Sequence, residues 1–280
     1  MIAQVVLMSL AKKMEHLKSI ITGCESAVIA FSGGVDSSLV CAVAHEVLGE
    51  RVVAVTAVSH TYPPGEIDVA KEVAKRIGIK HMIIETGELD DPRFIANPID
   101  RCYFCKGELL GKLDDVRKKF GFKKILDGTN HDDLSDFRPG YRALEELGVI
   151  SPLALAGISK EEVRQLAAEY SLPNFDKPAN PCLASRIPFG CKITQESLER
   201  IAKAEGFIHS LGFRVVRVRD HGDLASIEVA KSELEKAFRL KNEMEKNLMR
   251  LGYRFVTLDL EGYRSGSLNP KVVLDTKSWV

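Results

Sequence analysis

The sequence lacks an excess of charge of either sign. Its 280 residues contain 39 lysines and arginines against 39 aspartates and glutamates. A net charge of zero gives no global positive field to hold a long nucleic acid or an anionic membrane, so neither is expected as a partner. No apolar run reaches the length of a bilayer span, and residues 1–22 mix charges into a helical period. These absences lead us to expect a cytoplasmic protein.

Two common phosphate-binding loops are missing as well. No stretch matches G-x-x-x-x-G-K-[ST], and none matches G-x-G-x-x-G with its downstream acid. Internal repeats and low-complexity segments are also missing. Because 45% of the residues are apolar, the chain can still build the core of one large domain or two moderate ones.

Short β-branched runs alternate with helical periods through the first half of the chain. Strands are predicted at 26–31, 51–58, 80–85 and 123–127, and helices at 36–48, 65–77 and 106–120. This alternation predicts an α/β fold, a doubly wound parallel sheet that helices cover on both faces. Ligands of such sheets bind at the carboxyl ends of the strands, where the strand order reverses.

The second half of the chain has a different pattern. Residues 173–193 hold four prolines and no regular period, which predicts a long functional loop. A small α+β module follows, with helices predicted at 194–211 and 231–251 and strands at 213–219, 224–229 and 253–259. We therefore expect a domain at 1–172, a cysteine-bearing catalytic loop at 173–193, and a module at 194–280 for substrate binding and oligomerisation. A homo-oligomer is expected.

The stretch AFSGGVDSS (30–38) places two glycines between a predicted strand and a predicted helix. A glycine pair there lets backbone amides approach a ligand closely, and the helix adds the positive end of its dipole. The sequence therefore predicts a phosphate-binding loop. The alternative is a glycine-rich turn without a ligand.

The segment Ser32-Gly-Gly-Val-Asp-Ser37 resembles the SGGxDS loop of the PP-loop ATP pyrophosphatases. The resemblance implies that the 1–172 domain binds ATP by its pyrophosphate end while a substrate oxygen attacks the α-phosphate and forms an adenylate. It assigns the phosphates to Ser32, Gly33, Gly34, Ser37 and Ser38. It implies that Asp36 lies near Mg²⁺, Thr56 near adenine and ribose, and Gly128 and Thr129 beside the α-phosphate.

Six cysteines lie at positions 24, 41, 102, 105, 182 and 191, and no secretory segment suggests a disulfide framework. Cys102-Tyr-Phe-Cys105 stands at a predicted helix start, where both thiolates could face one metal centre. The alternatives are a thioredoxin-like redox pair and a pair of buried cysteines that serve only as core residues. Cys24 and Cys41 have apolar neighbours and are expected in the core.

Cys182 is a third candidate ligand, because nearby Arg186 favours its thiolate form. Three cysteines would leave one corner of a cubane [4Fe-4S] cluster to a non-protein ligand, whereas structural zinc or iron sites normally close with four. Cys191 could be the fourth ligand, although only eight residues, including Pro188, separate it from Cys182.

Further motifs resemble one branch of this superfamily, the LarE family of ATP-dependent sulfur transferases. They are 97–106 (NPIDRCYFCK), 127–130 (DGTN), Asp132, 138–140 (RPG), 151–153 (SPL), 182–186 (CLASR), 217–219 (RVR) and 258–269 (LDLEGYRSGSLN). Together with the phosphate loop they span nearly the whole chain.

The resemblance implies that a carboxylate of pyridinium-3,5-biscarboxylic acid mononucleotide is adenylated and its oxygen replaced by sulfur. This reaction belongs to the synthesis of the nickel-pincer nucleotide of lactate racemase. In that family the sulfur comes from a sacrificed cysteine or from a sulfide on a [4Fe-4S] cluster, and Cys102, Cys105 and Cys182 fit the cluster type. The implied cofactors are ATP, Mg²⁺ and the cluster, and the implied partners are a nucleotide substrate and a sulfide donor.

The same resemblance suggests roles for five residues of the second half. Arg186, Arg217 and Arg219 are candidates for the substrate phosphate, because a guanidinium matches phosphate geometry. Ser185 would act with Cys182, Asp36 and Arg186 in catalysis, and Glu205 would reach the site from the next helix. A solvated strand face is the alternative for Arg217 and Arg219.

One residue departs from the family pattern, because Cys191 stands where a small polar residue is expected. Two other functions remain open. A tRNA thiolase of the same superfamily would also use an adenylate and a CxxC pair, and an ammonia-dependent amide synthetase would use the same loop.

Overall fold

The computed structural model describes residues 9–135, 140–264 and 266–268. The chain divides into two compact units, residues 1–182 and 183–280, so the division falls inside the proline-rich segment 173–193. Four motif residues, Arg138, Pro139, Ser265 and Asn269, lie outside the described residues. Among the described helices, none is long and apolar enough to cross a membrane.

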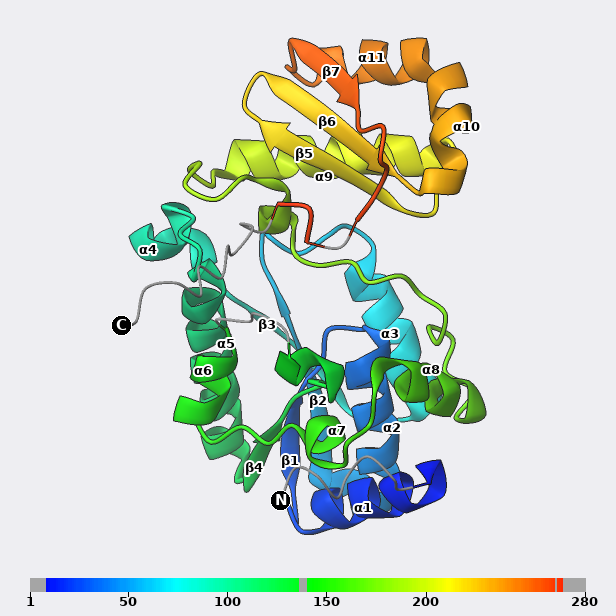
Figure 1. Cartoon of the computed structure of the whole chain (residues 1–280). Coiled ribbons are helices and arrows are strands. Elements are labelled where there is room, and N and C mark those ends of the chain that lie inside the picture. Colours follow the sequence, from blue (N-terminus) through cyan, green and yellow to red (C-terminus); the bar gives the residue numbers. More distant parts are fainter. Residues whose placement is uncertain (1–8, 136–139, 265, 269–280) are drawn as a thin grey trace, which may run out of the picture. The chain divides into compact units, whose positions relative to one another are not determined.

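The first unit is built on a four-stranded sheet with the order β3-β2-β1-β4, in which every pair is parallel (Figure 1). Its strands are β1 (Ala27–Ala30), β2 (Val52–Val58), β3 (His81–Glu85) and β4 (Lys124–Leu126). Each lies within the range that its β-branched run predicts. The predicted α/β fold with a parallel sheet is therefore confirmed.

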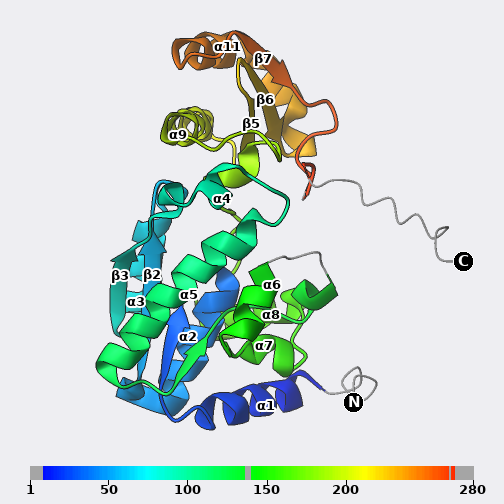
Figure 2. The ribbon, with the colours of Figure 1, turned by 90° about the vertical axis from the view of Figure 1, so that its left-hand side faces the viewer.

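Helices cover both faces of this sheet (Figures 1 and 2). The helices of this unit are α1 (Leu10–Thr22), α2 (Val35–Leu48), α3 (Glu66–Ile77), α4 (Pro92–Ile95), α5 (Arg101–Phe120), α6 (Gly140–Glu146), α7 (Pro152–Leu155) and α8 (Lys160–Glu169). Ala27 and Ile29 of β1 pack in a core with α1, α2 and α8, whereas Val28 packs in a second core with α5 and α6. Alternate residues of a strand point to opposite faces, so one short strand supports both cores.

The strand order reverses between β1 and β4. The chain passes from β1 outward to β2 and β3, and then returns to place β4 on the other side of β1. Loops that follow strands on either side of such a reversal diverge and leave a crevice between them. The fold therefore places the loops after β1 and after β4 around one crevice.

The second unit is a small α+β module with the sheet order β5-β6-β7. Its elements are α9 (Gln195–Ser210), β5 (Val216–His221), β6 (Leu224–Val229), α10 (Leu234–Arg239), α11 (Lys241–Arg250) and β7 (Phe255–Leu258). β5 and β6 are antiparallel, and β6 and β7 are parallel. Its core includes Ile208, Val218 and Leu248 and shares no residue with the cores of the first unit.

Two predicted helix boundaries are wrong. The single helix predicted at 231–251 is broken at Leu240 into α10 and α11, and this break lets both Ala237 and Met244 face the same core. The helix predicted to begin at Lys106 begins at Arg101, so Cys102 and Cys105 lie within its first two turns.

Candidate active site

The glycine-rich loop after β1 requires glycine at position 33. Gly33 has a φ of +72°, which side-chain residues rarely adopt, and an added Cβ would lie 3.1 Å from the Cβ of Ala70 in α3. Gly34 is the N-cap of α2, so the loop leads directly to the positive end of a 14-residue helix. The hydroxyl oxygens of Ser32 and Ser37 lie 3.2 Å apart across the loop.

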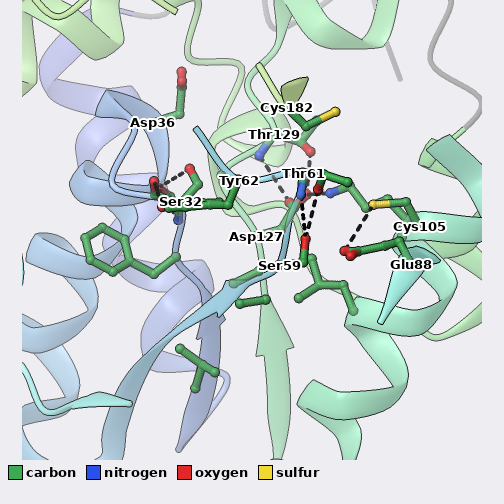
Figure 3. A pocket seen from close by; sticks show the side chains of 18 of the residues that line it. Ser32, Asp36, Ser59, Thr61, Tyr62, Glu88, Cys105, Asp127, Thr129 and Cys182 are labelled. Atoms are coloured by element: carbon green, nitrogen blue, oxygen red, sulfur yellow. Dashed lines mark hydrogen bonds and ion pairs between the residues drawn. The ribbon is translucent and has the colours of Figure 1, made fainter. Parts of the chain in front are cut away.

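A cavity of about 330 Å³ opens at the carboxyl ends of the strands, as Figure 3 shows. Ser32, Asp36 and Ser37 line it from the glycine-rich loop and α2, and Gly128 and Thr129 line it from the loop after β4. Its volume is in the range of small-molecule sites. The crevice at the strand-order reversal is thus a real cavity bearing the predicted phosphate-loop side chains.

The loop after β4 is held in place by a buried carboxylate. Asp127 is 3% exposed and accepts hydrogen bonds from Thr129 Oγ1 at 2.5 Å and from Ser151 Oγ at 2.7 Å. The next residue, Gly128, packs so closely on α2 that an added Cβ would lie 2.7 Å from the backbone nitrogen of Ser37. These contacts fix Gly128 and Thr129 beside the start of α2.

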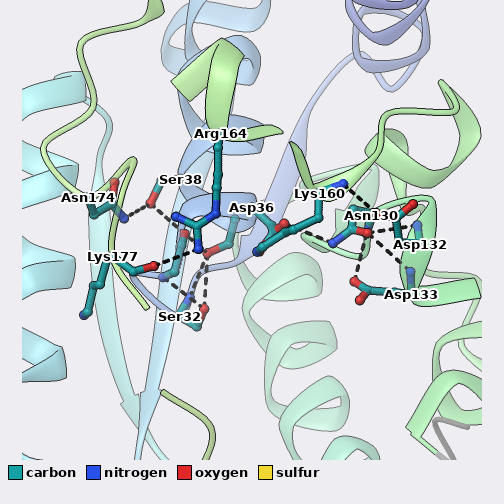
Figure 4. Close-up of polar contacts among 12 residues, drawn as sticks. Ser32, Asp36, Ser38, Asn130, Asp132, Asp133, Lys160, Arg164, Asn174 and Lys177 are labelled. Carbon is teal, nitrogen blue, oxygen red and sulfur yellow. Dashed lines mark hydrogen bonds and ion pairs between the residues drawn. The ribbon is translucent and has the colours of Figure 1, made fainter. Parts of the chain in front are cut away.

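Asp36 lies in an ion pair that the sequence did not predict (Figure 4). Its Oδ2 accepts a hydrogen bond from Lys160 Nζ, and its Oδ1 accepts one from Asn130 Nδ2 at 3.1 Å. Lys160 is the first residue of α8, where Ser159 and Glu162 form a capping box. That S-x-x-E pattern would have located the helix start, although not its position beside Asp36.

Four of the expected nucleotide contacts do not line the cavity, namely Gly33, Gly34, Ser38 and Thr56. Ser38 is fully buried, and its hydroxyl donates to Gly34 O and accepts from Asn174 Nδ2, both at 2.8 Å. Asn174 Nδ2 also donates to Gly33 O at 2.8 Å. Ser38 and Asn174 therefore do not line the cavity, and instead hold the glycine-rich loop by hydrogen bonds to the carbonyl oxygens of Gly33 and Gly34.

Thr56 is also fully buried, and its Oγ1 donates to Phe31 O at 2.7 Å. The residues that line the cavity from β2 and the loop after it are Val55, Ala57, Ser59, Thr61 and Tyr62. Tyr62 was not predicted, and its hydroxyl donates to Ser32 O at 2.9 Å.

Two of the three predicted ligand cysteines line the same cavity, Cys105 and Cys182 (Figure 3). Cys102 precedes Cys105 by three residues on α5, a spacing that places two side chains on one side of a helix. Burial raises the pKa of the Cys105 thiol, and the nearby acidic groups of Cys182, Glu88 and Cys102 raise it further. Cys105 Sγ donates to Glu88 Oε1 at 3.8 Å.

The three other cysteines differ in exposure. Cys24 and Cys41 are buried, as expected for core residues, and Cys191 is exposed. Within the described residues, no three His, Cys, Asp or Glu side chains are arranged to hold a metal ion as they stand. The chemistry of the donor set nevertheless fits iron and sulfur, because two thiols share the cavity and Cys102 lies one helical turn away.

The candidate residues of the second unit form a buried charged cluster. Arg186 is fully buried and binds Glu205 through two hydrogen bonds, of 2.9 Å and 2.8 Å. Arg219 donates to Glu228 Oε2 at 2.6 Å and to Ser185 O at 3.1 Å.

The arginines of β5 are not on a solvated face. Arg217 is 4% exposed and Arg219 is 6% exposed, so the alternative of a solvated strand face is wrong for both. The Arg217 guanidinium lies 5.1 Å from the centre of the Tyr263 ring. Burial lowers the pKa of Arg217, and the positive charge of Arg186 lowers it further.

Comparison with known proteins gives matches over part and over nearly all of the chain. The asparagine synthase family matches residues 25–100, which contain the glycine-rich loop. An uncharacterized protein of Synechocystis sp. is 45% identical over 262 residues, which cover 93% of this chain and 98% of the relative. The pyridinium-3,5-bisthiocarboxylic acid mononucleotide synthase of Lactiplantibacillus plantarum is 36% identical over 262 residues, or 93% of this chain and 95% of the relative. An uncharacterized protein of Methanocaldococcus jannaschii is 32% identical, over 85% of this chain and 90% of the relative.

Proposed function

Because the chain belongs to the LarE family of ATP-dependent sulfur transferases, we propose that it converts a carboxylate of pyridinium-3,5-biscarboxylic acid mononucleotide into a thiocarboxylate. One observation above all supports this proposal. The side chains of the phosphate loop and the thiols of Cys105 and Cys182 line a single cavity. An enzyme that activates a carboxylate with ATP and then delivers sulfur to it needs both sets of groups within reach of one carbon atom.

In this proposal, the first unit binds ATP and activates the carboxylate. Ser32 and Ser37 would bind the pyrophosphate end of ATP, together with the N-terminus of α2. Asp36 would hold Mg²⁺, because carboxylate oxygens are the ligands this ion prefers, and the ion would neutralise the departing pyrophosphate. Lys160 lies beside Asp36 and would add a second positive charge at that point.

In this proposal, the cysteines provide for the delivery of sulfur to the activated carboxylate. A [4Fe-4S] cluster bound by Cys102, Cys105 and Cys182 would offer sulfide at the one iron without a cysteine ligand. The burial that raises the pKa of Cys105 disfavours an isolated thiolate, so binding of a cation is expected to release its proton. Cys182 ends the first unit, and its loop is held by Lys177 Nζ and Asn180 Nδ2, which donate to Glu66 at 2.7 Å and 3.0 Å.

In this proposal, arginines of the second unit bind the substrate phosphate. Arg186, Arg217 and Arg219 gather three guanidinium groups in one buried cluster, and Glu205 and Glu228 hold Arg186 and Arg219 in fixed orientations. A dianionic phosphate matches such planar, preorganised donors. A homo-oligomer remains our expectation for the assembly.

The test is a reaction of the purified protein with ATP, Mg²⁺ and the biscarboxylic acid mononucleotide under anaerobic conditions. We expect AMP, pyrophosphate and a product whose mass shows one oxygen replaced by sulfur. Cys182→Ala should still release AMP but form no sulfur-containing product. AMP release that requires tRNA would instead favour a tRNA thiolase, and an amide formed with ammonia would favour an amide synthetase.

The metal proposal has a separate test, which is the iron and acid-labile sulfide content of the anaerobically purified protein. Cluster lost in Cys102→Ala and Cys182→Ala but kept in Cys191→Ala would support three-cysteine ligation. Loss in Cys191→Ala as well would make Cys191 the fourth ligand. Absence of iron in the wild type would refute the cluster and direct attention to a sacrificial Cys182.

A further inference from the structure

Asn174 is a buried side chain of the segment 173–193 and lies against Ser38 of α2 (Figure 4). It is only 4% exposed, and its Nδ2 donates to Gly33 O and to Ser38 Oγ, both at 2.8 Å. Ser38 Oγ gives its own hydrogen to Gly34 O. Both partners of Nδ2 are therefore acceptors, and only a side chain with two N–H donors can satisfy both.

The other polar atom of this amide indicates that its donors are what the position requires. Asn174 Oδ1 is buried and has no hydrogen-bond partner among the described residues. A buried acceptor without a partner is unfavourable. A serine would avoid that cost but would supply one donor instead of two. The presence of asparagine thus indicates that the glycine-rich loop needs both hydrogen bonds.

The hydrogen bond to Gly33 O fixes the orientation of the peptide between Gly33 and Gly34. In a trans peptide the C=O and the N–H point in opposite directions, so a carbonyl held toward Asn174 turns the Gly34 N–H away from it. This N–H donates to Ser32 Oγ at 3.3 Å. Because neither glycine has a Cβ to bar rotation, the peptide could turn over readily without Asn174.

The orientation of this peptide decides what Ser32 offers to a ligand in the cavity that it lines. When the Gly34 N–H donates to Ser32 Oγ, the serine O–H is left to donate to a phosphate oxygen, which only accepts. If the peptide turned over, Gly33 O would face Ser32 and accept that O–H. The carbonyl would also bring a partial negative charge toward the phosphate.

We propose that Asn174 is a positioning residue for the pyrophosphate end of ATP, because it holds the Gly33–Gly34 peptide in the orientation that lets Ser32 donate to phosphate. This inference rests on the proposed function, since it assumes that the glycine-rich loop binds that end of ATP. It requires neither sulfur delivery nor a metal centre. The segment that carries Cys182 thus also maintains the phosphate site.

The test compares the affinities of the full-length wild type and its variants for two probes, ATP with Mg²⁺ and AMP, by isothermal titration. In this proposal ATP contacts the glycine-rich loop through its β- and γ-phosphates, which AMP lacks. A general loosening of the cavity weakens the binding of both probes, whereas a turned peptide weakens that of ATP alone. Asn247→Asp is the matched control, because Asn247 Nδ2 also donates to a backbone carbonyl, Glu243 O at 2.9 Å, but on α11 of the second unit.

In Asn174→Ala we expect the Kd of ATP to rise roughly tenfold, because Gly33 O loses its donor and the peptide can turn over. Asn174→Asp should raise this Kd by about 100-fold, since a carboxylate repels Gly33 O and accepts the N–H of a turned Gly34. The Kd of AMP should stay within about twofold of the wild-type value in both variants. Asn247→Asp should match the wild type for both probes.

Wild-type ATP affinity in both Asn174 variants would overturn the inference, and so would an equal loss of affinity for ATP and AMP. If the variants do not fold, a crystal structure of the wild type with ATP and Mg²⁺ decides. There we expect Asn174 Nδ2 on Gly33 O and Ser32 Oγ on a β- or γ-phosphate oxygen, and a Gly33 carbonyl turned away from Asn174 would overturn the inference. A wild type that binds neither nucleotide would refute the ATP site and this inference together. Binding of ATP without any sulfur transfer would refute the proposed reaction alone.

Discussion

The ion pair between Lys160 and Asp36 leads to a prediction at the scale of one residue. Lys160 would face the pyrophosphate that departs when ATP is cleaved, so replacing it with methionine removes a charge that stabilises the transition state. We expect substrate-dependent AMP release to fall by about 100-fold. The measurement is AMP formation with ATP, Mg²⁺ and the carboxylated nucleotide.

Lys13→Met is the matched control for this variant. Lys13 binds Glu162 at 2.8 Å, on the same helix α8 that begins with Lys160. Its loss should leave AMP release unchanged within about twofold, because Lys13 does not line the cavity and pairs with Glu162 instead of Asp36. Equal AMP release by Lys160→Met and the wild type would show that Asp36 acts without this lysine.

His81 carries a second prediction at this scale, for the pH dependence of stability. Burial lowers the pKa of His81, and the charge of Lys71 lowers it further. Thr56 Oγ1 gives its hydrogen to Phe31 O, so at the 2.8 Å contact His81 Nε2 must be the donor. Because the pKa of His81 is lowered, the folded protein favours its neutral form. Stability is present above the unfolded-state pKa of about 6.5 and is lost as the pH falls toward the lowered folded-state pKa.

The variant His81→Phe keeps a ring against Phe31 but cannot titrate. We expect its free energy of unfolding to change less between about pH 7 and pH 5 than that of the wild type. Urea unfolding followed by circular dichroism at each pH gives both slopes. His16→Gln, at an exposed position of α1, should retain the wild-type slope. An unchanged slope in His81→Phe would assign the pH dependence to other groups.

At the scale of elements, the close contact between the loop after β4 and the start of α2 predicts the effect of Gly128→Ala. The added Cβ would lie 2.7 Å from a backbone nitrogen that cannot move without moving α2. We expect the free energy of unfolding to fall by about 1–3 kcal/mol. ATP affinity should fall by roughly tenfold or more, because the phosphate loop shifts.

Isothermal titration with ATP and Mg²⁺, together with thermal unfolding, measures both effects of Gly128→Ala. The control is Gly111→Ala in α5, where an added Cβ meets nothing within 4 Å and alanine favours the helix by about 1 kcal/mol. Wild-type ATP affinity in Gly128→Ala would mean that the two loops can separate without consequence for the site.

The sequence predicts the elements of the central sheet well, for a physical reason. Buried parallel strands require short β-branched runs, and the four strands of the first unit are such runs. The break at Leu240 could not be predicted, because the residues around it favour helix and only packing on a shared core bends the chain. The early start of α5 was missed because cysteine, tyrosine and phenylalanine are indifferent helix formers.

The candidate site was predictable only where neighbours in sequence are neighbours in space. Ser32, Asp36 and Ser37 share one local motif, and Cys102 and Cys105 share another. Lys160 lies 124 residues from Asp36, and Asn174 lies 141 residues from Gly33, so no local pattern joins them. The partnerless Oδ1 of Asn174 is similar, because it follows from burial in the folded chain alone.

At the scale of the whole molecule, the two units have separate hydrophobic cores. Leu248 packs among Ile208, Val218 and other residues of the second unit and is 0% solvent-exposed. Leu110 is equally buried in a core of the first unit. Chains with separate cores can lose stability in one unit while the other keeps its own.

This separation predicts that Leu248→Ala destabilises the second unit by about 2–5 kcal/mol, through lost burial and an unfilled cavity. Hydrogen exchange measured by mass spectrometry should accelerate in α9, β5 and β6 and remain at the wild-type rate in β1 and α2. Leu110→Ala should give the opposite pattern, because its cavity opens in the core beneath α5. If Leu248→Ala accelerates exchange in α2 as much as in α9, the two units unfold as one, and substitutions of buried residues such as Arg186 would then disturb the ATP cavity through global stability alone.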